Sequence, residues 1–452
     1  MPPVRDLIVL GLIVATLPLC FFRPFYGVGL WTILAFLNPH RMGWGAARSF
    51  PVALLVASAT VAGFLLFDRR VRNLVRPQAL IIIALWAWFA VTTAVTTQMP
   101  IFAHHSADTW ERFYFVSKIM LMTLVSLSLV DNWTRLRRFV LCIAASFGIL
   151  VAKSLPWMAM TGGSYRSYGP EGTMIADNND FGLALNMVFP IFFFLAKSEP
   201  APKVRAMFAF LTLATVPAVF FTWSRGALVG LTAVIGYIFV GSKQKLFLAP
   251  ILLFAVTLGV FFTPDAWRDR MTGVVTDKAD SSVQGRYNAW RFAWNLASEY
   301  PITGGGFDTF SPELFARYAP NATDLHASHS IYFGMLAEQG FVGLGLFLGL
   351  LTSCFWSLYR LKQLGKLYGD ERLIAYSRML TASLIAYMVC GAFLGRHYFD
   401  LFFDIVACVV MLNAAAEHEL LAGEDILAEP DRAGDDLGSD ADADGLRELG
   451  AI

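Results

Sequence analysis

The sequence has few charged residues. Only 15% of its 452 residues are charged, whereas 56% are hydrophobic. A soluble domain has about 25% charged residues, so the composition argues against a water-soluble globular fold. The five cysteines lie in separate apolar runs without paired spacing, which argues against a disulfide framework and against a zinc knuckle. The first apolar run, 7–22, lacks a clear small-residue cleavage site, so we expect it to be retained rather than removed as a signal peptide.

Long uncharged runs occupy most of the chain. Runs of roughly 16–20 uncharged residues are long enough to span or nearly span a bilayer core. The clearest are 50–67, 78–97, 246–263 and 340–359. Shorter or interrupted candidates are 7–22, 24–38, 113–130, 139–160, 181–196, 206–223, 226–242, 379–395 and 398–416. We therefore predict an all-α, polytopic membrane bundle of about twelve helices, or thirteen if the runs on either side of Arg23 are separate spans.

The same pattern predicts four regions. These are an N-terminal transmembrane bundle (1–263), a large loop with amphipathic helices (264–329), C-terminal transmembrane helices (330–416) and a tail (417–452). The tail has twelve acidic residues against two arginines, a composition typical of a disordered, solvating extension.

Basic residues predict the orientation of the bundle. Lysine and arginine are enriched in the short loops 68–76, 131–138, 197–205, 242–245 and 360–366. These five loops fall on one side if the spans alternate, and such loops face the cytoplasm. The large loop 264–329 then faces the periplasm. The side of the N-terminus stays open, because one bent element or two spans fit residues 7–38 equally well.

The large loop does not have a disordered composition. Loops longer than about 12–15 residues are usually functional or disordered. Residues 285–300 place Tyr287, Trp290, Trp294 and Leu296 at helical spacing, which predicts an amphipathic helix at the membrane surface. The segment "PITGGGF" then ends the helix with a proline and a glycine turn. No strand precedes the glycines, so they do not indicate a nucleotide-binding loop, and nothing indicates a nucleic-acid partner.

Three ionisable residues stand at the predicted external ends of spans: Arg225, Arg286 and His329. Each has an ordinary explanation, because an arginine at a helix end can snorkel to lipid headgroups and a histidine can be a satisfied interfacial residue. Together they suit a lipid diphosphate substrate. Arginine binds phosphate through two hydrogen bonds, and histidine is suited to proton transfer near neutral pH.

These residues lie in three ordered motifs: "SRGALVGL" (224–231), "GRYNAW…YPITGGGFDTF" (285–310) and "HSIYFGMLAEQGFVG" (329–343). The series resembles the signature of the O-antigen ligase and O-antigen polymerase superfamily. In that family the histidine is usually followed by Asn, and here Ser330 follows it. The segments 23–45 and 168–187 further resemble the ligase branch that accompanies exosortase A systems, whose members are described as O-glycosylation ligases.

The resemblance implies an inverting, metal-independent glycosyltransferase in the bacterial inner membrane with a periplasmic active site. The donor would be a polysaccharide on undecaprenyl diphosphate, and the acceptor a hydroxyl of the lipid A–core, another glycan or a protein. His329 would act as the base, and Arg225 and Arg286 would offset charge on the leaving diphosphate. No cofactor is implied, and the donor's lipid tail would leave the site through a cleft between the loop and the spans.

Other polar residues are further candidates for substrate binding. Arg166 and Lys153 could reach the same cavity, although each could also face solvent or snorkel. Asp177 and Asp180 of "DNND" could hold a divalent cation, but we expect them to cap the next span and to meet sugar or loop groups. His326 and His329 have metal-ligand spacing if they are helical, yet the sequence offers no clear third ligand. His104 and His105 are interpreted as solvated.

Two rival functions remain at this stage. A polymerase of the same superfamily would differ only in its acceptor. A polysaccharide transporter or flippase would need polar residues at mid-membrane depth, and these are sparse.

Overall fold

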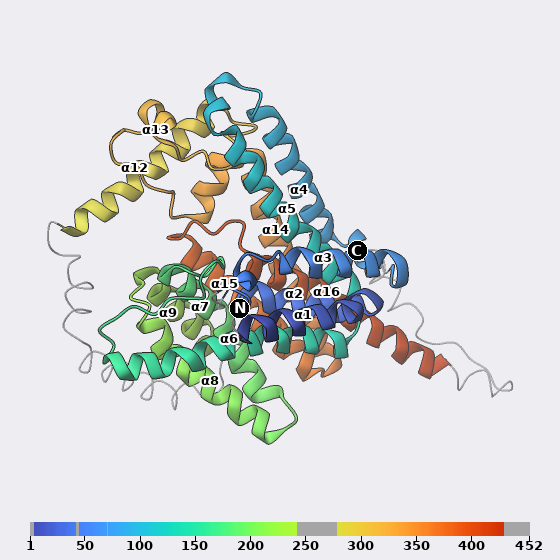
Figure 1. Ribbon diagram of the computed structural model, residues 1–452. Helices are drawn as coiled ribbons and strands as arrows, with labels where there is room; N and C mark the ends of the chain where they lie inside the picture. Colours follow the sequence, from blue (N-terminus) through green and yellow to red (C-terminus); the bar gives the residue numbers. More distant parts are fainter. Residues whose placement is uncertain (1–3, 42–44, 70, 242–277, 429–452) are drawn as a thin grey trace.

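The structure is a computed structural model that describes residues 4–41, 45–69, 71–241 and 278–428. These residues form helices and connecting segments without a β-strand, as predicted (Figure 1). The helices of the first half are α1 (Val4–Phe22), α2 (Pro24–Leu37), α3 (Val52–Phe67), α4 (Pro77–Thr96), α5 (Ser106–Leu129), α6 (Trp133–Thr161) and α7 (Asn178–Ser198). Those of the second half are α8 (Pro202–Phe220), α9 (Arg225–Val240), α12 (Lys278–Glu299), α13 (Pro312–Tyr318), α14 (Ile331–Tyr368), α15 (Glu371–Gly391) and α16 (Asp400–Ala428). Short 3-10 helices occur at η1 (Ala46–Arg48), η2 (Arg72–Val75) and η3 (Pro100–His105).

The predicted apolar runs correspond to these helices. Eight helices of the described residues are long and apolar enough to cross a membrane, and α1, α2, α3 and α9 are shorter apolar helices. The polytopic helical bundle is therefore confirmed. The predicted span 246–263 and the first part of the large loop lie outside the described residues.

Residues 7–38, which the sequence allowed to be either one bent element or two spans, form two separate helices, α1 and α2. The helical conformation is interrupted at Arg23, between α1 and α2. Asp6, near the start of α1, accepts hydrogen bonds from the backbone N–H groups of Gly45 (2.8 Å) and Ala47 (3.4 Å). A side chain at Gly63, near the end of α3, would collide with the backbone of Phe21, near the end of α1. Helices α1 and α3 therefore run parallel and in contact, and α2 runs in the opposite direction beside both. The start of α1 thus lies at the same end of the bundle as the start of α3.

The bundle has two chemically different ends. At one end, Glu417 of α16 pairs with Arg72 and Arg76, and Glu199 pairs with Arg137. We call this the basic end, because four of the five predicted basic loops lie there and the fifth, 242–245, lies outside the described residues. The opposite end contains residues 38–41 and 45–51 and the connections 97–105, 161–177 and 300–330, and we call it the loop end.

Helices α12 and α13 form a cap beside the connection from α4 to α5, at one extremity of the molecule (Figure 1). The predicted helix at 285–300 is present, but its buried face is made by Ala289, Phe292, Ala293, Leu296 and Ala297. Two of the aromatic residues assigned to its apolar face, Tyr287 and Trp294, are 55% and 54% exposed. The helix is therefore present, and small residues on its buried face let it pack closely against its neighbours. The contact of its exposed aromatic residues with a membrane surface stays a prediction.

Helix α14 is broken at Gly340, which has φ 66° and ψ −171°. The break leaves carbonyl groups of α14 without helical hydrogen-bond donors, and the glycine turn of the cap provides N–H groups that donate to them. The backbone N–H of Gly305 donates to Ala337 O (2.8 Å), and that of Gly306 donates to Glu338 O (3.0 Å). The "TGGGF" segment therefore fastens the cap to the half-helix 331–339.

The C-terminal boundary differs from the prediction. The tail was expected to be disordered from residue 417, but α16 continues to Ala428. Glu417 and Glu419 meet Arg72, Arg76 and Arg372 at the basic end, which favours the helical continuation. Residues 429–452 lie outside the described part.

Candidate functional site

His329 is the last residue before the N-cap of α14, at the loop end. It has φ 42°, in the left-handed region that few non-glycine residues occupy. Ser330 is the N-cap, and its backbone N–H donates to Ser328 Oγ (3.4 Å). Such backbone conformations persist where surrounding contacts hold them, and they often mark active sites.

The cap holds the His329 segment in place. The indole N–H of Trp290 donates to Ser328 O at 2.8 Å, and its ring stacks on Phe333 at 5.1 Å. Asn288, two residues earlier on α12, donates to the backbone carbonyls of Asn321 (2.7 Å) and Asp324 (3.0 Å). A side chain at Gly285 would come within 3.1 Å of His326 Nε2. The "GRYNAW" motif therefore positions the loop that ends at His329.

The other predicted catalytic residues gather around this loop. Burial and the nearby Arg225 lower the pKa of Arg286, so the two guanidinium groups act on each other. Burial also lowers the pKa of His329, and Arg286, His326 and Arg396 lower it further, whereas Asp177 raises it. The ring of His329 is half-buried, and the described residues offer its nitrogens no hydrogen-bond partner. A neutral histidine in a cationic site results, and it can accept a proton.

Arg225 is presented by a tight turn. It is the first residue of α9, where Ser224 is the N-cap and its Oγ accepts a hydrogen bond from Ala227 N (3.3 Å). Trp223 just before it has φ 59°. Asn178 at the start of α7 donates to Thr222 O (2.7 Å) and fixes the turn. An arginine at a helix N-terminus adds its charge to the positive end of the helix dipole, a combination that favours anions.

Asp177 and Asp180 have the capping role expected of them only in part. Asp177 is the N-cap of α7, with its Oδ1 accepting from Asn179 N (2.8 Å). Asp180 instead forms an ion pair with Arg396. Among the described residues no group of three or more potential metal ligands comes together, and the His326–His329 segment is not helical.

Arg396 is the site residue that the sequence analysis missed. It lies in the short connection between α15 and α16, where Tyr387 donates to its backbone carbonyl (2.9 Å). A side chain at Gly395 would contact the backbone N of His329 at 3.7 Å. A run of "GRHYFD" between two apolar segments was the available signal.

His326 lies in the same loop as His329 and acts on it electrostatically. Its Nδ1 lies 3.1 Å from Asp324 Oδ1, so this histidine has an acidic neighbour within the loop.

His105, interpreted as solvated, is 4% exposed, and its Nε2 lies 3.4 Å from Gly305 O beneath the cap. That interpretation was wrong for His105, because the cap covers it.

Lys153 and Arg166 line a cavity of about 690 Å³ beside this cluster. The cavity is also lined by Trp157, Tyr165 and Trp223, and the Arg166 guanidinium carbon is 5.9 Å from the Trp223 ring centre. Trp223 directly precedes the turn that carries Arg225, so the cavity adjoins the cationic cluster. Aromatic rings and cations of this kind can contact sugar rings and phosphates.

Comparisons with known proteins give two family matches. Residues 4–199 match a family of unknown function (DUF5935), and this segment contains Lys153, Arg166, Asp177 and Asp180. No curated protein matches the chain. Residues 208–348 match the family model described as O-Antigen ligase, and this segment contains Arg225, Arg286, His326 and His329. The segment 208–348 therefore carries a domain of the O-antigen ligase and polymerase superfamily.

Proposed function

We propose that the protein is an O-antigen ligase that transfers a polysaccharide from undecaprenyl diphosphate to a hydroxyl of the lipid A–core at the periplasmic face of the inner membrane. The observation that carries the proposal is a half-buried His329 beside Arg286 and Arg396, with Arg225 beside Arg286. Family membership supports glycosyl transfer of the ligase or polymerase type. The exosortase-associated branch stays a prediction.

In the proposed reaction, the acceptor hydroxyl oxygen attacks the anomeric carbon of the first donor sugar. The new glycosidic bond forms as the bond from that carbon to the diphosphate breaks, and the configuration inverts. A ring nitrogen of His329 takes the hydroxyl proton, and undecaprenyl diphosphate leaves with the bonding electron pair.

The arginines act on the leaving group. Negative charge grows on the diphosphate as the bond breaks, and donors that are already in place stabilise this charge without reorganising. Arg225 and Arg286 are close enough to repel each other electrostatically, an arrangement that an anion between them would relieve. Arg396 is partly neutralised by Asp180, so we assign it to holding the His329 loop and to tuning the charge of the site.

Lys153 and Arg166 are proposed to bind glycan or phosphate groups in the neighbouring cavity, with Trp157 and Tyr165 as stacking surfaces. Asp177 is proposed to orient the site through its charge on His329. His326 is proposed to support the loop, and a direct substrate contact is its secondary role.

The test is transfer by purified protein in lipid vesicles, with undecaprenyl diphosphate–glycan as donor and lipid A–core as acceptor. We expect glycan-modified lipid A–core, with equal yield in excess EDTA. Elongation of the donor glycan instead would identify a polymerase. Loss of transfer on chelation, with recovery on Mg²⁺ addition, would overturn the metal-independent mechanism and place Asp177 at a metal.

A further inference from the structure

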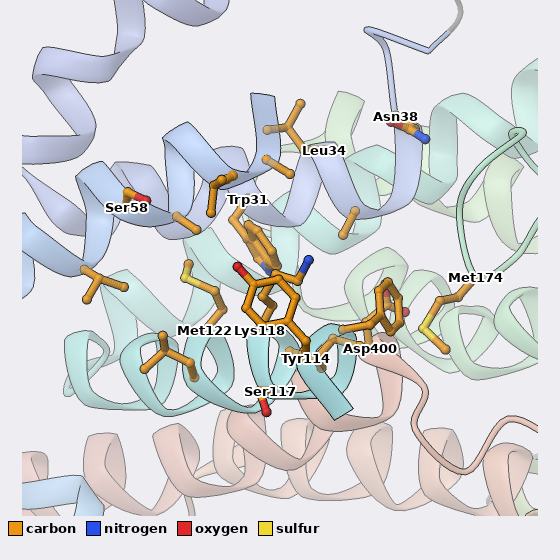
Figure 2. Close-up of a pocket in the computed structure, with 18 of the residues that line it drawn as sticks. Trp31, Leu34, Asn38, Ser58, Tyr114, Ser117, Lys118, Met122, Met174 and Asp400 are labelled. Atoms are coloured by element: carbon orange, nitrogen blue, oxygen red, sulfur yellow. The ribbon is translucent and has the colours of Figure 1, made fainter. Parts of the chain in front are cut away.

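A second cavity, of about 620 Å³, lies between α2, α3 and α5 (Figure 2). Its walls are mostly apolar and include Leu54, Val61 and Leu65 of α3, with Trp31 of α2 and Met122 of α5. Leu54 and Leu65 are exposed on the outside of the bundle, so the cavity is a groove that is open on the α3 side.

The groove has the length of a lipid chain. Its α3 wall runs from Ala53 to Leu65, about 18 Å at 1.5 Å per residue. This is close to the thickness of one leaflet, about half of the 30 Å hydrocarbon core. An apolar groove with this length and a lateral opening suits a hydrocarbon chain that enters from the bilayer.

The loop end of the groove is cationic. His40 and Arg41 follow α2 and line this end, together with Gly172 and Met174 of the connection before α7. His40 is 7% exposed, and its Nδ1 has no hydrogen-bond partner among the described residues. Burial and Arg41 lower the pKa of His40, so the ring is neutral and can offer an N–H to an anion.

A lysine lies farther along the same groove. Figure 2 shows Lys118 and Tyr114 of α5 pointing toward Trp31, and the Lys118 ammonium is 4.4 Å from the centre of the Tyr114 ring. The described residues provide Lys118 with no ion pair. Asp400 is the one acidic residue in the lining, and it accepts a hydrogen bond from the backbone of Leu401 (2.8 Å). An ammonium group at membrane depth is costly and tends to be retained for a partner.

The cationic end is built rather than incidental. Gly172 has φ 72°, and a side chain there would come within 2.6 Å of the Arg41 guanidinium. Asn38, the left-handed C-cap of α2, donates to Glu171 O (3.1 Å). These contacts hold Arg41 against the connection that leads to Asp177.

We propose that this groove binds a membrane lipid with an anionic phosphate headgroup, its chain along α3 and its phosphate at His40 and Arg41, with Lys118 as a further cation in the groove. The site is distinct from the His329 cluster, but the same two segments of the chain contribute residues to both. The connection that lines the groove at Gly172 and Met174 reaches the cluster at Asp177, and Asp400 follows Arg396 by four residues. A lipid held here would therefore have its headgroup beside the reaction site.

The test is native mass spectrometry of the purified full chain with phosphatidylglycerol or with phosphatidylcholine of the same chain length. Because binding is measured without transfer, the outcome does not depend on the proposed function. We expect retention of phosphatidylglycerol over phosphatidylcholine. We also expect about fivefold weaker binding of phosphatidylglycerol by Lys118→Met and by Arg41→Gln, from the usual effect of one cation near a lipid phosphate.

Ala57→Phe, which fills the groove, is expected to weaken the binding of both lipids. Lys203→Gln removes an exposed cation at the start of α8 and is the matched control, with melting temperatures recorded for each variant. Equal retention of the two lipids by the wild-type protein, or unchanged binding by both charge variants, would overturn the proposal. Complete competition by inorganic phosphate, without an effect of Ala57→Phe, would mean a free-anion site and would also overturn it.

Discussion

At the scale of single residues, the site combines one neutral acceptor of protons with several fixed cations. His329 is held before the N-cap of α14 by Trp290 and Ser328, and its pKa is lowered by burial and by surrounding cations. The helix dipole at this position acts in the same direction. The sequence motifs pointed to Arg225 and Arg286, whereas Arg396 comes from a connection that only the fold brings close to His329.

The pH dependence of transfer follows from the lowered pKa of His329. The neutral ring is the active form, and its pKa lies below the ordinary value of about 6.5. Transfer should therefore be constant through pH 7 to 8 and decline only at acidic pH, as the ring is protonated. The measurement is the initial rate against pH under saturating donor. A midpoint above pH 7 on the acidic limb would contradict the assignment.

The arginines should not tolerate lysine. Arg225→Lys and Arg286→Lys keep the charge but lose the planar pair of donors, and we expect each to lower kcat about 100- to 1,000-fold, as for loss of an oxyanion donor. Arg291→Lys, on an exposed position of α12, is the control and should retain transfer. Near-normal kcat in both test variants, with normal membrane levels, would remove the arginines from the mechanism.

At the scale of elements, the glycine turn of the cap fastens the cap to α14, at the point where that helix is broken. Gly304 has φ 62°, and a Cβ at this position would lie 2.5 Å from Ala337 O. The segment therefore needs glycine both for its backbone angle and for its approach to the half-helix 331–339, whose first residues follow His329.

Gly304→Ala should loosen the cap. We expect a loss of about 1–3 kcal/mol from the strained backbone, together with reduced transfer, because the His329 loop rests on the same half-helix. The measurement is the thermal melting temperature with the transfer rate. Gly345→Ala is the matched control on α14, since a Cβ there meets nothing within 4 Å, and it should leave the melting temperature unchanged or raise it. Equal behaviour of the two variants would show that the turn does not carry the cap.

Elements were more predictable than their contacts. Apolar runs and basic loops predicted where the helices lie along the chain, because burial in lipid depends on local composition. The break at Gly340 and the pairing of Arg396 with Asp180 could not be foreseen, since both depend on segments that meet only in three dimensions. His105 was misjudged for the same reason. The motif series pointed to Arg225, Arg286 and His329, whose roles stay predictions, whereas Arg396 lies outside those motifs.

At the scale of the whole molecule, the two ends of the bundle predict its orientation. Arginine-rich connections gather at the basic end, and the candidate site lies at the loop end. The usual distribution of basic residues would put the basic end in the cytoplasm. The parallel course of α1 and α3 would then put the start of α1 on the periplasmic side.

Cysteine labelling tests this orientation. We expect Thr323→Cys and Val4→Cys to react with a membrane-impermeant maleimide in cells with a permeabilised outer membrane, because both positions are exposed at the loop end. Lys203→Cys, at the basic end, should react only after lysis. The reversed pattern would turn the site toward the cytoplasm, away from the proposed substrates.

The most direct measurement is transfer by His329→Gln and His326→Gln in the purified vesicle assay, with donor binding measured alongside. Glutamine keeps size and hydrogen bonding but cannot take the hydroxyl proton. The account predicts that His329→Gln binds donor yet loses nearly all transfer, whereas His326→Gln, whose neighbour is Asp324, retains most of it. Full transfer by His329→Gln, or equal losses in the two variants, would contradict His329 as the base.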